Sequence, residues 1–262
     1  MTDPGVLLAA YDAQLRGDAE TSDAARVTTL GPLSLATYAE GRGFISYRDL
    51  DGADEERVRG LVAAACAHYA DDPKVTRVEW KTRGHDRAPG LHEALLEHGF
   101  RPEEPESIMI GEARALAVDV PLPEGVALRR VTDDADVWAM SAVQGRVFDD
   151  PHWQERAKAA LRRVAGGDDV EMWVAEVDGQ VVSAGRLEPV PGSDFAGLWG
   201  GVTLPKWRGR GIYRGLTAAR AKSALRRGKT LLNSDSTEFS RPILERSGLL
   251  KVSTTTPYLW RR

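Results

Sequence analysis

The chain has 262 residues, with 35 Lys and Arg against 39 Asp and Glu and a formal net charge of −4. This length fits one large domain or two modest ones, and the acidic balance argues against a dedicated nucleic-acid-binding protein. One cysteine, Cys66, excludes an internal disulfide, and no apolar run reaches the ~18 residues of a membrane span. We expect a cytoplasmic protein with no membrane partner, and the histidine spacing predicts no metal site.

The N-terminal half predicts a helix over 56–69, a strand over 75–81, a short helix ending at Gly99 and a strand over 107–110. Its loop before the first of these helices is acidic, with Asp49, Asp51, Asp54, Glu55 and Glu56. Such a loop would repel phosphate groups. Residues 114–124 read as a linker, because Pro and Gly cluster at its end.

The C-terminal half predicts a longer series of elements, each recognised from its hydrophobic period and its turn residues. We expect a strand over 126–130, helices within 129–148 and over 153–164, a hairpin of 171–177 and 180–187, a strand over 197–204, a helix over 212–227, a strand over 230–234, a helix over 241–247 and a strand over 253–260.

The two halves repeat one order of elements. In an alignment without a gap, the segment from Leu95 to Phe100 matches residues 244–249, and the strand after it matches the last strand. This match predicts a duplication. The predicted domains are therefore 1–113, a linker over 114–124, and 125–262.

Residues 207–216, which follow the strand over 197–204, read as a phosphate cradle. Glycines at alternate positions allow a close backbone approach, and the amides of the following helix point at any anion held there. Between Pro205 and Lys229 the chain has nine basic residues and no acidic one. A ligand with several phosphates is indicated.

These residues resemble the GNAT superfamily of N-acyltransferases. Arg208-Gly209-Arg210-Gly211-Ile212 is similar to its signature Arg/Gln-x-x-Gly-x-Gly/Ala, which binds the pyrophosphate of coenzyme A, and the block 243–249 is similar to its late helix. The resemblance implies an α/β (α+β) fold of tandem GNAT-like domains, each a mixed, mostly antiparallel sheet flanked by helices. The N-terminal copy is degenerate, since it lacks the basic cradle.

The resemblance also implies the cofactor-binding residues for acetyl-CoA and a backbone donor at Leu204 that polarises the thioester carbonyl. The cofactor-binding residues are Val202, Thr203, Leu204, Arg208, Gly209, Arg210, Gly211, Ile212, Tyr213, Arg214, Thr237 and Ser240. Two positions depart from the family pattern. Tyr213 replaces the last small residue of the signature, and Leu244 stands where many relatives have a tyrosine that protonates the leaving thiolate.

The candidates for a general base are Glu188, which ends a strand, and Asp235, which closes the strand beside the predicted cofactor site. A solvated strand end and a turn cap explain the same two residues. For the acceptor amine we consider Asp149 and Asp150, whose charge would attract a cation, and Trp153, which could stack on it. Trp199 could line the same pocket, although a core position explains it as well.

The predicted function is acetyl-CoA-dependent transfer of an acetyl group to a primary amine of a small molecule, by direct transfer in a ternary complex. The alternative is a non-catalytic protein that binds or senses acyl-CoA, which Leu244 favours. A third interpretation, transfer from aminoacyl-tRNA, predicts a basic RNA channel that this acidic chain lacks. Oligomeric state, monomer or homodimer, is undetermined by sequence.

Overall fold

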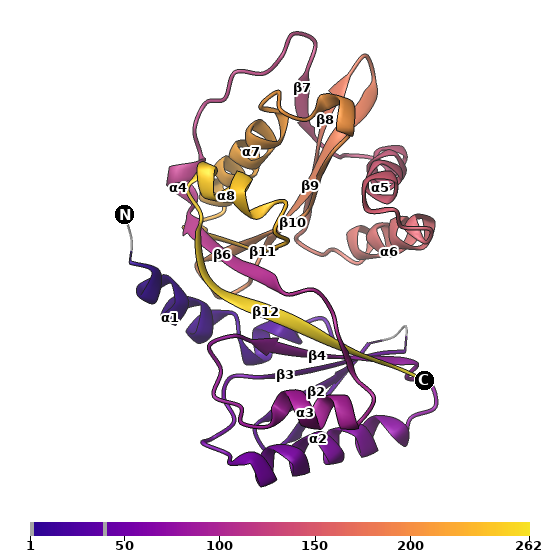
Figure 1. Cartoon of the computed structure of the whole chain (residues 1–262). Coiled ribbons are helices and arrows are strands. Elements are labelled where there is room, and N and C mark those ends of the chain that lie inside the picture. The colour runs from indigo at the N-terminus through magenta and orange to yellow at the C-terminus, as the bar shows by residue number, and fades with distance from the viewer. Residues whose placement is uncertain (1–2, 39–40) are drawn as a thin grey trace. The chain divides into compact units, whose positions relative to one another are not determined.

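The structure is a computed structural model that describes residues 3–38 and 41–262 (Figure 1). The described residues fall into two compact units. Unit 1 comprises Met1–Ile108, Asp235–Arg241 and Lys251–Arg262, and unit 2 comprises Met109–Ser234 and Pro242–Leu250. The predicted domains 1–113 and 125–262 differ from this division, because the last strand of the chain belongs to unit 1.

Unit 1 is a sheet with the strand order β1-β2-β3-β4-β12 and with β5 paired to β12. β1, β2 and β3 form an antiparallel meander, β3 and β4 are parallel, and β12 is antiparallel to β4. Its elements are α1 (Pro4–Gln14), η1 (Gly17–Glu20), β1 (Arg26–Leu30), β2 (Leu33–Thr37), β3 (Arg42–Tyr47), α2 (Glu55–Ala70), β4 (Arg77–Arg83), α3 (Leu91–Glu97), β5 (Arg101–Pro102) and β12 (Leu250–Arg261).

One face of this sheet carries the core of unit 1. Alternate residues of a strand share a face, so Val78 and Trp80 of β4 point to the side that α2 and α3 cover (Figure 1). Trp80 is fully buried and contacts Phe100 edge to face, with 6.4 Å between ring centroids. On α2, Val58 and Val62 lie one turn apart and complete the contact.

Unit 2 has the strand order β6-β11-β10-β9-β8-β7. β7 to β10 are antiparallel neighbours, and β11 is parallel to β10. Its elements are β6 (Glu106–Glu112), which begins within unit 1, α4 (Ala113–Leu116), β7 (Ala127–Arg130), α5 (Asp134–Phe148), α6 (Trp153–Ala165), β8 (Glu171–Val177), β9 (Gln180–Pro189), β10 (Phe195–Thr203), η2 (Pro205–Trp207), α7 (Ile212–Arg226), β11 (Leu231–Ser236) and α8 (Arg241–Ser247).

Helices flank this sheet on both faces: α5 and α6 lie on one side, and α4, α7 and α8 on the other (Figure 1). One apolar cluster contains Val137, Met140 and Val174, and another contains Leu198, Ala221 and Leu244. The predicted fold class is confirmed: each unit is a mixed, mostly antiparallel sheet with flanking helices. No helix among the described residues is long and apolar enough to cross a membrane.

Removing the last strand should destabilise unit 1 rather than unit 2. β12 pairs with β4 from Thr255 to Arg261, so a chain that ends at Leu250, which keeps Leu249 in the apolar cluster of unit 2, leaves one edge of β4 without its backbone partners. We expect hydrogen exchange to accelerate by orders of magnitude at the amides of β4 and to stay slow in β8 and β9. A chain that ends at Trp260 is the control. Equal protection of β4 in both truncated chains would contradict this role of β12.

Candidate functional site

The candidate site of unit 2 begins where β10 leaves β11. The parallel register between the two strands covers only Phe195 to Gly197 on β10, whereas β10 continues to Thr203. On its other side, β10 follows β9 with a register shift between Trp199 and Val202. Such a bulge bends a strand and increases its twist. The second half of β10 is therefore bent and lies beyond the ladder that it makes with β11.

The bulge is held in place from the α5 side of the sheet. Gly200 has φ +59°, a conformation that glycine adopts at low cost. The side-chain amide of Gln144 donates a hydrogen bond of 2.7 Å to the Gly200 carbonyl. A Cβ atom at Gly200 would lie 2.6 Å from this amide nitrogen. The glycine is thus required by its backbone angle and by the close contact with Gln144.

The register with β9 decides which amides of β10 point away from β9, to the side where the pairing with β11 has ended. We call this the open side of β10. The N–H of Leu204 donates a 2.9 Å hydrogen bond to the Val182 carbonyl. Antiparallel strands alternate between residues that bond the neighbour and residues that point away from it. Thr203 therefore directs its N–H away from β9. The expectation that Leu204 supplies the carbonyl-polarising donor does not fit this geometry, because its single amide hydrogen already bonds Val182.

The phosphate cradle predicted from the sequence follows as a compact turn. η2 leads into Arg208, whose Nε atom donates a 3.1 Å hydrogen bond to the Thr203 carbonyl and ties the turn to the end of β10. Gly209 and Gly211 have φ angles of +74° and +79°. A Cβ at Gly209 would find no heavy atom within 4 Å. The turn is consequently open on the side of Gly209.

The N-terminus of α7 faces this turn without a side-chain cap. Gly211 is the N-cap residue, and α7, which the structure describes in full, has no acidic residue in its first turn. The amides of 212–214 have no partner one turn earlier in the helix. The helix dipole adds partial positive charge at this end. Arg208, Arg210 and Arg214 are exposed beside it, and the Arg210 guanidinium lies 4.9 Å from the Trp207 ring centre.

Glu188 is held by two arginines. Its carboxylate accepts hydrogen bonds from Arg163 at 3.2 Å and from Arg186 at 2.9 Å. Burial by itself raises the pKa of Glu188, but the two guanidinium groups outweigh burial and lower the pKa below its ordinary value. Glu188 is therefore ionised at neutral pH and is a weak base. Its predicted role as general base stays a prediction.

Asp235, Thr237 and Ser240 belong to unit 1, whereas the cradle belongs to unit 2. Asp235 forms an ion pair of 2.9 Å with Lys81. The Thr237 carbonyl accepts hydrogen bonds from the amides of Ser240 and Arg241, so this segment forms the turn that begins α8. The interpretation of Asp235 as a strand-closing residue is consistent with these contacts, and its catalytic role stays a prediction.

The residues considered for the acceptor amine line an open pocket between α5 and α6. Asp149, Asp150 and Trp153 lie there together with Arg146. Asp150 forms an ion pair with Arg156 at 2.5 Å, and Trp153 contacts Trp138 edge to face at 6.1 Å between ring centroids. The structure thus brings the three predicted residues together, although part of their charge is already balanced.

Trp199 and Leu244 are the remaining positions that the sequence singled out. The Trp199 indole folds over Gly197 on the same face of β10, since a Cβ at Gly197 would lie 2.1 Å from the indole nitrogen. Leu244 is buried in an apolar cluster that includes Leu198, and Tyr213 packs against the same cluster. The Leu244 side chain offers no proton, and the Tyr213 hydroxyl lies against Gly201 of β10.

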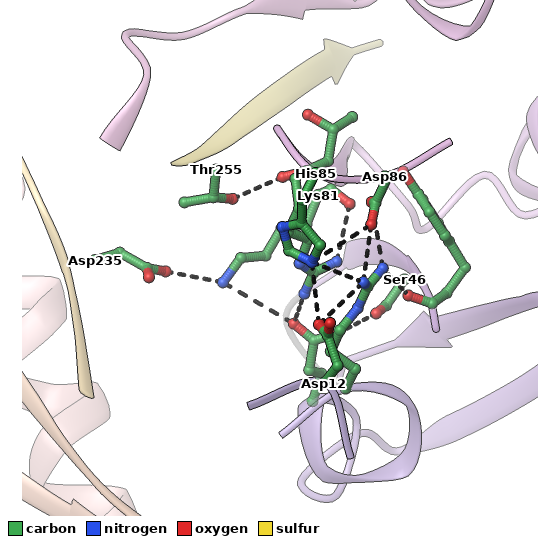
Figure 2. Close-up of polar contacts among 12 residues, drawn as sticks. Asp12, Ser46, Lys81, His85, Asp86, Asp235 and Thr255 are labelled. Atoms are coloured by element: carbon green, nitrogen blue, oxygen red, sulfur yellow. Dashed lines mark hydrogen bonds and ion pairs between the residues drawn. The ribbon is translucent and has the colours of Figure 1, made fainter. Parts of the chain in front are cut away.

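Unit 1 has the same arrangement of a meander, a crossover helix and a parallel strand. The space between its diverging parallel strands, β3 and β4, is filled by side chains of the chain itself. The register of β3 with β4 ends at Ile45 with Trp80. Beyond it, Arg16 donates a 2.8 Å hydrogen bond to the Tyr47 carbonyl and pairs with Asp86 at 2.8 Å. Glu20 binds both Ser46 and Arg83. Figure 2 shows this polar cluster, with Asp12 of α1, Ser46 of β3 and Asp86, which follows β4.

The crossover helix of unit 1 also differs at its N-terminus. Asp54 caps α2 by accepting a 2.9 Å hydrogen bond from the Arg57 amide, and Glu55 and Glu56 occupy the first turn. These carboxylates satisfy the helix dipole that α7 leaves open. The acidic loop predicted from the sequence thus occupies the position of the cradle in unit 2.

Comparisons with known proteins agree with this geometry. Residues 136–245 match the model of the acetyltransferase (GNAT) family. The matched segment, which is less than half of the chain, is similar to GNAT acetyltransferase domains. The match begins in α5, ends in α8 and includes the cradle. A comparison with curated proteins gives no match.

Solved structures share the fold over most of this chain at low identity. A GCN5-related N-acetyltransferase from Kribbella flavida is 18% identical, with a TM-score of 0.66, and the alignment covers 97% of this chain and 93% of that one. A conserved protein of unknown function from Staphylococcus epidermidis is 14% identical, with a TM-score of 0.69 and coverage of 92% and 95%. A tandem GNAT protein of the clavulanic acid biosynthesis pathway is 17% identical, with a TM-score of 0.63 and coverage of 87% and 78%.

Arg16→Ala should destabilise unit 1 strongly. The Arg16 side chain is 2% exposed and its partner Asp86 is 7% exposed, so the substitution leaves a buried carboxylate without its cation. We expect a loss of about 3–5 kcal/mol in the free energy of unfolding. Arg26→Ala, which breaks an exposed pair with Asp72, is the control and should cost at most about 1 kcal/mol. Denaturant unfolding of both variants measures the difference, and equal losses would contradict the proposed filling of the space between β3 and β4.

Proposed function

We propose that this GNAT protein transfers an acetyl group from acetyl-CoA to a primary amine of a small molecule, by direct transfer in a ternary complex in unit 2. The observation that supports it most is the uncapped N-terminus of α7, which the cradle turn connects to the bent end of β10. In unit 1 the matching features are filled by the protein's own side chains. We therefore expect one site per chain.

The cradle fits the diphosphate of coenzyme A. The amides of 212–214 would donate hydrogen bonds to its oxygens, and the exposed Arg208 and Arg210 would balance its charge. The open space at Gly209 allows the backbone to approach closely. When bound, acetyl-CoA supplies the activated acetyl group as a thioester.

Thr203 provides the amide that we propose as the carbonyl donor. Its N–H points away from β9 because the neighbouring Leu204 already bonds Val182. A donor fixed in a strand needs no reorientation as negative charge develops on the carbonyl oxygen. The pantetheine arm would run beside the same end of β10, between the cradle and Thr203.

The acceptor amine must lose a proton before it attacks. Glu188 stays ionised between Arg163 and Arg186, so as a base it would act weakly and through water. The pocket of Asp149, Asp150 and Trp153 presents carboxylates and an indole to a cationic amine. We propose this pocket as the route by which the acceptor enters.

Reversing the charge of the cradle should abolish binding of coenzyme A. Two arginines that each contribute about 1.5–3 kcal/mol to a charged hydrogen bond predict at least a 100-fold increase in Kd for Arg208→Glu with Arg210→Glu. Arg226→Glu, at the other end of α7, makes the same change of charge and should alter Kd by less than about threefold. Isothermal titration calorimetry measures both, and unchanged affinity of the double variant would contradict the cradle.

Calorimetry with the unmodified chain also tests the number of sites. We expect one coenzyme A per chain, because Asp54 and the Arg16 cluster occupy the equivalent positions of unit 1. Thiol release from acetyl-CoA with a panel of primary amines then separates catalysis from the alternative function of an acyl-CoA-binding or sensing protein. Stoichiometric binding without thiol release for any amine would favour the alternative. Two bound molecules per chain would contradict the reading of unit 1.

A further inference from the structure

Arg220 of α7 is a buried cation in an unusual setting. It is 1% exposed, and burial lowers the pKa of its guanidinium. Among the described residues, its hydrogen-bond partners are uncharged oxygens, namely the carbonyls of Leu216 and Arg186 and the hydroxyls of Thr217 and Tyr213. A buried charge is usually balanced by an opposite one. Of these partners, the Tyr213 hydroxyl alone can become an anion.

Two glycines on neighbouring strands make room for this pair. A Cβ at Gly185 of β9 would lie 2.6 Å from Nη1 of Arg220, and a Cβ at Gly201 of β10 would lie 2.7 Å from the hydroxyl oxygen of Tyr213. Both distances are shorter than van der Waals contact. The guanidinium therefore packs against the backbone of Gly185, and the phenol packs against the backbone of Gly201.

Tyr213 places its hydroxyl on the bent part of β10. Gly201 lies within the bulge, two residues before Thr203, which corresponds to about 6.6 Å along a strand. A ligand that starts at the cradle and follows the amide edge of β10 to Thr203 has its far end beside this hydroxyl. Tyr213 is the second residue of α7, so its phenol and the end of the cradle belong to the same helix.

We propose that Tyr213 is the proton donor for the leaving thiolate and that Arg220 is its positioning residue. This inference rests on the proposed function. The amine nitrogen bonds the carbonyl carbon, the C–S bond breaks, and the electron pair stays on sulfur, which takes the phenolic proton of Tyr213. The phenolate is held beside Arg220 until it regains a proton from water. The neutral amine becomes positively charged when its nitrogen bonds the carbonyl carbon, and it then loses one proton to solvent.

The charge of the pair explains why this tyrosine suits the step. In the resting state Arg220 is a cation without an anion, and Arg186 adds further positive potential. Loss of the phenolic proton gives the buried guanidinium its counter-charge, so the charge that develops on Tyr213 is stabilised by a group already in place. Arg220 faces the phenol from about two turns further along α7, and Arg186 lies on β9.

Tyr213→Phe is the direct test, with acetyl-CoA and the most active amine of the panel as substrates. A lost general acid predicts a fall in kcat of about 100-fold or more, with KM for acetyl-CoA and Kd for coenzyme A changed by less than about threefold. Tyr258→Phe, which removes a hydroxyl paired with His92 in unit 1, is the matched control. A Tyr213→Phe enzyme with kcat within about threefold of the unmodified one would overturn the proposal.

Two further measurements separate proton donation from a structural role. A fluorinated tyrosine at 213, with a more acidic phenol, should move the basic limb of the kcat profile to lower pH. Gly185→Ala, which displaces Arg220 without changing either side chain of the pair, should lower kcat and leave coenzyme A affinity unchanged. An unmoved limb would overturn the role of Tyr213. If the unmodified chain releases no thiol, both the proposed function and this inference are wrong. If the unmodified and Tyr213→Phe chains are equally active, only this inference is wrong.

Discussion

Backbone groups that leave a ladder must find other partners, and both units of this protein meet this demand where two parallel strands diverge. In unit 1 the demand is met from within the chain, because the Arg16 guanidinium binds the Tyr47 carbonyl and Glu20 binds Ser46. In unit 2 the corresponding length of β10 turns its Thr203 amide to the open side. The same topology thus yields a filled cleft in one unit and a candidate binding cleft in the other.

The two crossover helices repeat this contrast. α2 and α7 follow equivalent strands, but α2 begins with the carboxylate of Asp54 and two glutamates, and α7 begins with Gly211 and exposed arginines. A helix N-terminus attracts one anion well, so a carboxylate built into the chain competes with any external phosphate. The difference between a structural unit and a candidate catalytic unit therefore depends on a few residues at one helix end.

The buried polar groups of unit 2 show how packing and chemistry are linked. Arg220 is placed beneath β9 and β10 only because Gly185 leaves space, and Gly201 does the same for Tyr213. A buried cation without a carboxylate is costly, so its retention in a tightly packed position needs a physical reason. Stabilisation of charge on the neighbouring phenol during thiolate release supplies one.

The sequence by itself determined the features that depend on local order. Alternating glycines before a helix indicated the cradle, the hydrophobic periods located the elements of residues 126–260, and the acidic loop of the N-terminal half predicted a copy without a phosphate site. Local order is sufficient here because helix ends, hairpins and turns are set by neighbouring residues. The family resemblance rested on these same features and was confirmed.

Tertiary structure decided what depends on register and on distant contacts. The proposed donor is Thr203 rather than Leu204, because the direction of an amide follows from the pairing of β10 with β9, and a shift of one residue reverses it. β12 joins unit 1 because it pairs with β4, about 170 residues earlier in the chain, and Arg16 reaches Asp86 in the same way. Arg220 and Gly185 carry no sequence signal of their own, since only packing brings a guanidinium against a missing side chain.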